Sequence, residues 1–527
     1  MSPCRRSCSC IQSNPPTPSS FTTRRRSISM HARAVRRRRR LIAGLVGTLG
    51  LTLIGGCTQP APSATPSETA APRPFTVMVT GAITSIDPAV ATSRTDSMLV
   101  TSVYQRLMFV DSGTGDLKPD AATDCAFTSR LVYECTLASS LTFHNGDQLT
   151  STDVRFSILR ALRLDVEGTS VGLLSSLRRI EAPNAQTVRF VLSREDNQFG
   201  YALAGQATSI VDHRNFDPDF PLPLATLPVG SGPYAVTEVS PDAALVAKFE
   251  KYFGPTMGQL DEMKLQVAAD SVAAEAAVAA NGVEVAWSCL DDAAQQRLEN
   301  EMATNNGPTN SGFTKVALPG VKVSRLYWSP QSKLRRNAVL RAGVAKALQA
   351  DRSLDSVVPL GVPDRVKAFA IGGRPKLPKL KGQRINLTLG YDPADPGQAD
   401  SARMLRDRIE ELDTVSVRIT TSAKADLVLT SAPAWINNSL GWLQLYLSAP
   451  LASSKAKLSS LEAHARGATG NSRAADLSEL QQQAAADNTV LPVSQRDGLL
   501  LVGPNVKIGG GAFGSGQQLG FWGFSRG

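Results

Sequence analysis

Apolar and polar positions alternate with two different periods along this chain, and together they predict an ordered series of strands and helices. Apolar residues at every second position, or in short bounded runs, predict strands at Phe75–Thr80, 229–239, 244–254, 261–270, 385–392, Val415–Thr420 and 425–430. Apolar residues three or four positions apart predict helices that begin near Ser97, Thr150, Ser271, Asn337 and Gln398. The first of these helices is expected to carry Leu99, Val103 and Leu107 on one face. Helices that alternate with strands in this way are typical of α/β proteins.

Local signals refine several of these elements. Thr150 and Asp153 form a pattern close to a capping box, which predicts the start of a helix. Asn281-Gly282 is expected to end the Ala-rich helix before it. His144 follows a strand end beside an Asn-Gly turn, where the pattern favours a solvated ring. The helix after Asn337 is expected to point three apolar side chains inward, namely Val339, Val344 and Leu348.

A basic and then apolar segment precedes the first strand. Five arginines at 36–40 lead into 41–55, an apolar run shorter than the roughly 20 residues that span a bilayer. This order is that of an export signal, and Ile54-Gly55-Gly56-Cys57 resembles a bacterial lipobox. Cys57 would then carry the lipid, and the Pro/Ser/Ala-rich tract after it would be a disordered tether. The alternatives are an uncleaved helical anchor, a start at Met30, and export by either the general or the twin-arginine route.

The net charge of the mature chain differs from that of the whole chain. The whole chain carries +10, but residues 1–56 hold 11 Lys and Arg and no Asp or Glu, which leaves −1 for the mature chain. The basic character therefore belongs to the signal, and nucleic-acid binding is not expected. Roughly 470 mature residues exceed one ordinary core, which predicts two or three lobes.

Two cysteines occupy neighbouring strand-like arms. Cys125 and Cys135 lie ten positions apart, with a short Thr-Ser-Arg turn between the arms. Exported proteins can keep disulfides, so a cross-strand disulfide is expected here. The alternative is a pair of buried free thiols. Cys289 is expected to be a small buried residue.

Residues that could carry catalysis or hold a metal are few. The three histidines of the mature chain, His144, His213 and His464, lie far apart in sequence. No His-x-x-x-His, Cys-x-x-Cys, Gly-x-Ser-x-Gly or P-loop pattern occurs. We therefore expect a protein that is not an enzyme, with no catalytic residues, no metal and no cofactor.

Seven segments occur in the order in which they occur in a known family: SIDPA, VYQRL, LTFHNGDQLTSTDVRFSILRAL, VGSGPYAV, AANGVEVAW, VLRAGVAKALQADRSL and VLPVSQRDGLLLVG. On these segments the chain resembles the family 5 solute-binding proteins of ABC importers, which are dipeptide- and oligopeptide-binding lipoproteins, in their actinobacterial form. The resemblance covers most of the mature chain. It implies an α/β fold of the type II periplasmic-binding-protein kind, with two α/β lobes joined by hinge strands and an extra domain inserted in the first lobe.

The resemblance also implies boundaries between these parts. The signal would occupy 1–56 and the tether 57–74. The first lobe would be assembled from three pieces, 75–105, 227–324 and 489–527. The inserted domain would occupy 106–226, and the second lobe 325–488.

The function that the resemblance implies is that of a monomeric, lipid-anchored receptor on the outer face of the cytoplasmic membrane. It would enclose a small molecule or peptide between its lobes and deliver it to permease subunits in the membrane. ATP hydrolysis would take place on separate subunits, which agrees with the missing P-loop. The backbone after the Ile/Leu-Asp-Pro motif lines the cleft in this family, so Thr92 and Ser93 are ligand-binding candidates. Trp435 is the candidate for an aromatic wall of the cleft.

Two positions depart from the usual pattern of the family. Asn438 stands where peptide binders carry an acid that pairs with the free amine of the ligand, and Gln105 stands where Glu is common. Asn438 is therefore a ligand-binding candidate that offers an amide, and weak binding of free-amine peptides is expected. Two other functions remain open: a sensor on the same fold that does not transport, and, less favoured, an extracytoplasmic hydrolase.

Overall fold

The computed structural model describes residues 73–527 apart from 112, 113, 381, 383, 432, 510, 511 and 514–518. The expected export signal, Cys57 and most of the expected tether lie outside the described residues. No helix of the described part is both long and apolar enough to cross a membrane.

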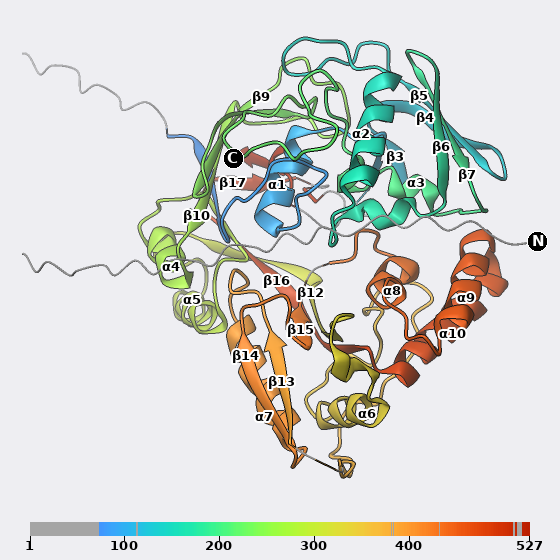
Figure 1. Ribbon diagram of the computed structural model, residues 1–527. Helices are drawn as coiled ribbons and strands as arrows, with labels where there is room; N and C mark the ends of the chain where they lie inside the picture. The colour runs from blue at the N-terminus through green and yellow to red at the C-terminus, as the bar shows by residue number, and fades with distance from the viewer. Residues whose placement is uncertain are drawn as a thin grey trace, which may run out of the picture. The chain divides into compact units, whose positions relative to one another are not determined.

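A ten-stranded mixed sheet runs through the described residues (Figure 1). Its order is β14-β13-β15-β12-β16-β11-β1-β10-β9-β8. The strand bounds, in that order, are Val415–Thr420, Ile385–Gly390, Leu427–Thr430, Thr314–Trp328, Val490–Val502, Val285–Trp287, Phe75–Thr80, Glu262–Ala268, Ala243–Lys248 and Tyr234–Val239. β1 is parallel to β10 and β11, and β13 is parallel to β14 and β15. The α/β architecture expected from the sequence is confirmed.

The first strand is mostly apolar because both of its faces are covered. In β1, Phe75, Val77 and Val79 pack into one cluster with apolar residues of α1 (Arg94–Val103). Met78 points to the opposite cluster, which contains residues of α4 (Ser271–Ala279) and α5 (Asp292–Asn305). Helices on both faces of a parallel strand are what an α/β sheet requires.

Two long strands join two hydrophobic cores. β12 and β16 are antiparallel, and one end of each contributes to a core formed by residues between Val323 and Val493. Their other ends lie in the clusters around β1. The register between them shifts at Leu318/Lys322 and again at Ser324/Arg325, so the pair is irregular midway between the two cores.

The segment between α1 and β8 forms a core of its own. Its four-stranded antiparallel sheet has the order β4-β5-β7-β6, with bounds Ala122–Ser129, Val132–Leu137, Thr187–Leu192 and Leu177–Asn184. The other elements are β2 (Met108–Val110), β3 (Leu117–Pro119), α2 (Ser151–Leu164), η1 (Ser170–Leu174), α3 (Phe199–Ala202) and η2 (Gln206–Thr208). The expected capping box is present, since Thr150 and Asp153 exchange hydrogen bonds at the start of α2.

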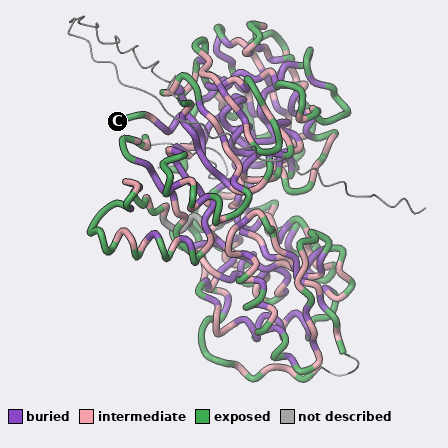
Figure 2. The backbone as a smooth tube through the Cα atoms, turned by 90° about the vertical axis from the view of Figure 1, so that its left-hand side faces the viewer, coloured by how far each residue is buried: buried purple, intermediate pink, exposed green. Residues whose placement is uncertain are grey.

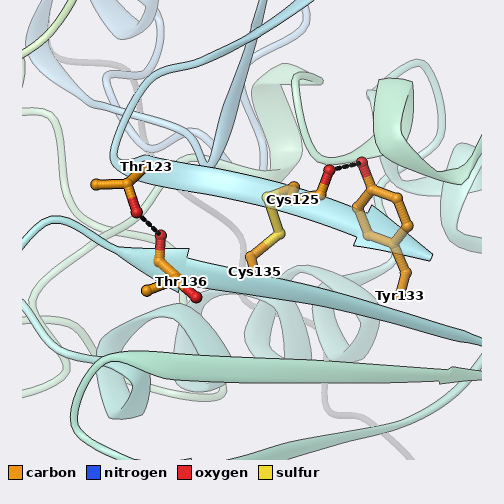
Figure 3. Close-up of a disulfide and its surroundings, with 5 residues drawn as sticks. All are labelled: Thr123, Cys125, Tyr133, Cys135 and Thr136. Carbon is orange, nitrogen blue, oxygen red and sulfur yellow. Dashed lines mark hydrogen bonds between the residues drawn. A yellow bond between two sulfur atoms is a disulfide. The ribbon is translucent and has the colours of Figure 1, made fainter. Parts of the chain in front are cut away.

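A disulfide joins Cys125 and Cys135, which stand directly opposite each other on β4 and β5 (Figure 3). The Tyr133 hydroxyl donates to the Cys125 carbonyl at 3.3 Å, and the Thr123 hydroxyl donates to the Thr136 carbonyl at 3.2 Å. Most of the remaining residues of β4 are exposed, so this strand has few apolar contacts that could hold it to β5. The covalent link fixes the register of the hairpin.

The remaining helices surround the other end of β12 and β16. They are η3 (Lys333–Arg336), α6 (Ala338–Ala347), α7 (Gln398–Glu410), α8 (Ser439–Leu447), α9 (Lys455–Gly467) and α10 (Gly470–Asp487). The chain ends with β17 (Val506–Ile508), η5 (Phe521–Gly523) and β18 (Phe524–Arg526). Figure 2 shows that buried residues line the interior of the folded part and that exposed residues follow its outer turns.

Three local expectations were wrong. Val339 is 54% exposed, because α6 begins at Ala338 and its first turn faces outward. The first helix ends at Val103, so Leu107 is buried from an extended segment rather than from a helix. The ring of His144 is not solvated, since it lies against the Phe249 ring and contacts the backbone at Gly230 and Gly232.

Candidate functional site

A pocket of about 130 Å³ lies where the two halves of the large sheet meet. Its lining comes from the start of α1, the segment after β11, the irregular part of β12 and β16, and the segments after β13 and β15. β1 and β11 are parallel to each other, and so are β13 and β15. The carboxyl ends of parallel strands are the usual place for ligands in α/β sheets, so this pocket is the candidate ligand site.

Arg94 lies on one side of the pocket, at the first position of α1. Its Nη1 donates to the Ser288 hydroxyl, and its guanidinium carbon lies 5.7 Å from the centre of the Trp287 ring. Ser93 caps α1 by accepting from the Asp96 amide, which fixes where the helix begins and therefore where Arg94 stands. The hydroxyl and the ring together hold the guanidinium at the pocket wall.

Asp395 approaches Arg94 from the loop between β13 and α7. Its carboxylate is 4% exposed and lies 3.3 Å from Lys322 Nζ and 4.0 Å from Arg94 Nη2. Ser431 and Gln398 also donate to it, Gln398 at 2.8 Å. Burial acts to raise the pKa of Asp395, but Arg94, Lys322 and these hydrogen bonds outweigh burial and hold the pKa below its ordinary value of 3.8. Asp395 is therefore ionised at neutral pH.

Ser288 has an unusual backbone conformation at the pocket wall. Its φ is +52°, in the left-handed region that residues other than glycine rarely adopt. Its hydroxyl accepts from Arg94, and its carbonyl accepts from the Thr80 hydroxyl at 3.4 Å. The same Thr80 hydroxyl donates to the Ala394 carbonyl at 2.8 Å. Strained residues of this kind often mark functional sites, and here the strained residue positions a cationic side chain.

The outer rim of the pocket carries exposed charges. Arg496 Nη1 lies 3.4 Å from an Asp292 oxygen, and both side chains are more than half exposed. Asp497 lines the same rim. Since solvent screens these exposed groups, Arg94 and Lys322 dominate the electrostatics of the less exposed part of the pocket around these two residues, which we call its inner end.

None of the candidates named from the sequence is among the residues that line this pocket. Thr92 is exposed, and Ser93 uses its hydroxyl as the cap of α1. Trp435 is partly buried against the core of the inserted segment. Asn438 caps α8, accepting from the Gly441 amide at 2.9 Å, and donates to Gln198 at 2.6 Å.

The residues that sequence reasoning missed are Arg94, Lys322, Asp395 and Ser431. Arg94 immediately follows the two candidates Thr92 and Ser93. Asp395 and Ser431 follow two strands, β13 and β15, that the alternating pattern did predict. The position after a parallel strand was therefore an available signal, but only the pairing of the strands shows that these positions meet.

Two further features bear on metal binding and on nucleophilic chemistry. Oxygens of Asp153 and Asp212 and a ring nitrogen of His213 lie within 4.8 Å of one another. Their atoms are used in hydrogen bonds, since His213 Nδ1 contacts Asp153 at 2.7 Å and Asp212 accepts from Arg214 and Asn215.

Cys289 is buried, and desolvation raises the pKa of its thiol to about 12, so it is not a reactive thiolate.

Comparison with known proteins gives a family match over part of the chain. Residues 116–360 match the model of bacterial extracellular solute-binding proteins, family 5 Middle. A curated relative, the HTH-type transcriptional regulator SgrR of Salmonella choleraesuis, is 27% identical over 183 residues, which are 35% of this chain and 31% of the relative. The chain thus spans about a third of the length of the curated relatives that it matches.

Solved structures match over much more of the chain. The periplasmic binding protein DppA of Helicobacter pylori, in complex with the peptide STSA, has a TM-score of 0.70 at 16% identity and covers 86% of this chain and 98% of its own. NikZ of Campylobacter jejuni, in complex with Ni(L-His), has a TM-score of 0.67 at 14% identity, with coverages of 86% and 99%. At this identity the likeness shows the fold, which is that of the type II periplasmic binding proteins, as the resemblance to family 5 implied.

Proposed function

We propose that this protein is the solute receptor of an ABC importer, because residues 116–360 match the model of bacterial extracellular solute-binding proteins, family 5 Middle, and the chain has the fold of the periplasmic binding proteins. It encloses a small solute between two lobes and presents the closed form to permease subunits in the membrane. It acts as a monomer, and ATP is hydrolysed on separate subunits. It catalyses no reaction itself.

The observation that supports this proposal is the pocket between two pairs of parallel strands that β12 and β16 connect. We assign the first lobe to 75–105, 227–324 and 489–527, the second lobe to 325–488, and the inserted domain to 106–226. A rotation at the irregular part of β12 and β16 would then move Asp395 relative to Arg94 and open or close the pocket.

The proposal includes a lipid anchor at Cys57. The basic and apolar run before this cysteine and the Pro/Ser-rich tract after it are the supporting features. Cys57→Ser should release the protein from the membrane fraction, or leave it as uncleaved precursor, in fractionated cells. Lipid labelling that persists in this variant would contradict the assignment.

A sensor without transport is the second candidate function. The curated relatives at 23–27% identity carry the name of transcriptional regulators, although the match covers about a third of their length. Deletion of the gene separates the two candidates. A receptor for import is required for uptake of the labelled solute, whereas a sensor is required only for the response to it.

Solute capture is tested on the purified full-length protein. Native mass spectrometry before and after mild denaturation should release a small solute at one molecule per chain. Adding this solute back should change the fluorescence of Trp287, which lines the pocket, and Trp287→Phe should remove that change. If no solute is released, and neither culture extract nor pools of amino acids and peptides raise the melting temperature, the proposal fails.

A further inference from the structure

The size of the pocket limits the size of the solute that can bind in it. Its volume is about 130 Å³. A protein cavity of roughly 150 Å³ accommodates benzene, whereas sites for drug-sized ligands span roughly 300–1,000 Å³. The pocket therefore has room for a solute about as large as one amino acid, and a tetrapeptide exceeds it.

The inner end of the pocket has more positive than negative charge. Arg94 and Lys322 are 29% and 27% exposed, and both flank the single buried carboxylate of Asp395. The rim adds Arg496, Asp292 and Asp497, of which Arg496 and Asp292 pair with each other in solvent. A second carboxylate at the inner end would balance the two cations, whereas an uncharged ligand would leave one cation desolvated without a partner.

The donors of Arg94 are available for such a group. Within the described part of the chain, the hydrogen bond formed by its side chain is the one to Ser288. Asp395 lies 4.0 Å away, beyond hydrogen-bond distance, and one of its oxygens accepts from Ser431 and Gln398, while Lys322 Nζ lies 3.3 Å from the other oxygen. A guanidinium presents five N–H donors and binds a carboxylate with two parallel hydrogen bonds.

We infer that the solute is a small carboxylate-bearing molecule of about the size of one amino acid, and that Arg94 and Lys322 determine this specificity by holding its carboxylate. This inference rests on the proposed function, because it assumes that the pocket is where the solute binds. Arg94 binds the carboxylate with two parallel N–H hydrogen bonds, and Lys322 adds a second positive charge. Asp395 lies within 4.0 Å of both cations, so the bound carboxylate shares Arg94 and Lys322 with this buried acid.

The experiment compares free acids with their amides. Pools of the proteinogenic amino acids, the corresponding 2-hydroxy acids, the amino acid amides, and di- and tetrapeptides are screened by thermal shift on the full-length protein. Hits are titrated by calorimetry. At least one free acid should bind, and its amide should bind at least tenfold more weakly.

Variants then test which residues cause the preference for the free acid over its amide. Arg94→Gln should weaken binding of the acid at least tenfold and bring it to the level of the amide, and Arg94→Lys should give an intermediate loss. Arg163→Gln is the matched control, because Arg163 forms an exposed ion pair with Asp219 outside the pocket. It should leave binding unchanged. Lys322→Gln provides a second test if Arg94→Gln does not fold, as judged by circular dichroism.

Each remaining outcome overturns either the inference about the solute or the proposed function. Equal binding of acid and amide, binding of tetrapeptides without free acids, or an unchanged preference in folded Arg94→Gln and Lys322→Gln would overturn the inference and leave the solute receptor intact. No binding from any pool and no solute released from the purified protein would overturn the proposed function, and the inference with it.

Discussion

At the scale of single residues, one buried ion pair connects two segments that lie far apart in the chain. Asp87, the acid of the SIDPA segment, and Arg160 of α2 are 0% and 1% exposed. Two hydrogen bonds of 2.8 and 2.6 Å join the guanidinium to the two carboxylate oxygens, and the Leu222 amide donates to the same carboxylate. This pair ties the segment before α1 to the inserted segment, so its role is structural.

Asp87→Asn should destabilise the protein by roughly 3–5 kcal/mol, because it leaves the Arg160 guanidinium buried without its counter-charge. Asp219→Asn is the control, since it breaks the exposed pair with Arg163 and should cost less than about 1 kcal/mol. Urea unfolding of both variants measures the difference. Similar small losses in the two variants would show that the buried pair is not needed for stability.

At the scale of elements, close packing determines the turn that leads into β8. A methyl group at Gly230 would lie 2.1 Å from the carbonyl oxygen of Val103, at the end of α1, so only glycine fits. The Gly230 amide donates to His144 Nδ1 at 3.3 Å, and His144 Nε2 lies 3.1 Å from the Gly232 carbonyl, to which the neutral ring donates. Burial lowers the pKa of His144 to about 4, and the bond to Gly232 opposes this shift only in part.

The stability of this contact should depend on pH. Since the folded pKa lies below the unfolded value of 6.5, the unfolded chain binds a proton that the folded chain does not. The stabilisation that comes from burying the neutral His144 ring is complete above pH 6.5 and is lost as the pH falls toward about 4. The free energy of unfolding should have fallen by roughly 2 kcal/mol at about pH 4.5.

His144→Gln should remove this part of the pH dependence. Unfolding free energies of the wild type and the variant are compared at neutral pH and near the lower end of the window. The comparison cancels the contributions of the other titrating groups. If the two proteins lose stability equally on acidification, His144 is not the group responsible.

At the scale of the whole described chain, a second set of contacts joins the inserted segment to the helices near the C-terminus. Arg466 of α9 lies 3.3 Å from Asp196, and these side chains are 3% and 0% exposed. The Asn197 amide donates to the Arg466 carbonyl at 2.8 Å, and Asn438 donates to Gln198 at 2.6 Å. This set, which we call the 196–198 contact, lies outside the residues that line the pocket and holds these two sides, the inserted segment and the helices near the C-terminus, together.

Asp196→Ala should shift the protein toward an open state and weaken solute binding, because it removes the carboxylate of the inserted segment that pairs with Arg466 and leaves Arg466 paired only with Glu462 of its own helix. The radius of gyration from small-angle scattering should increase without solute and return toward the wild-type value when solute is saturating. Glu462→Gln is the control, since Glu462 pairs with Arg466 within α9 and does not join the two sides. Equal radii for Asp196→Ala and the wild type would show that the 196–198 contact does not stabilise closure.

The sequence alone determined the features that depend on neighbours a few residues apart. The capping box at Thr150 and Asp153, the end of α4 before Asn281 and most strands follow from local periodicity and local hydrogen bonds. The α/β class follows from their order. Asn438 also carried a local signal, because Asn is a preferred N-cap, yet its resemblance to a family position suggested a ligand role instead.

The tertiary structure decided which distant residues meet. Arg94 and Asp395 face each other only because β11 pairs beside β1, β13 pairs beside β15, and β12 and β16 join the two halves of the sheet. The burial of Asp196 against Arg466 and the outward direction of Val339 depend in the same way on which surface packs against which. Periodicity specifies a face for each element, but the partner of that face is set by strand pairing and packing between segments far apart in the chain.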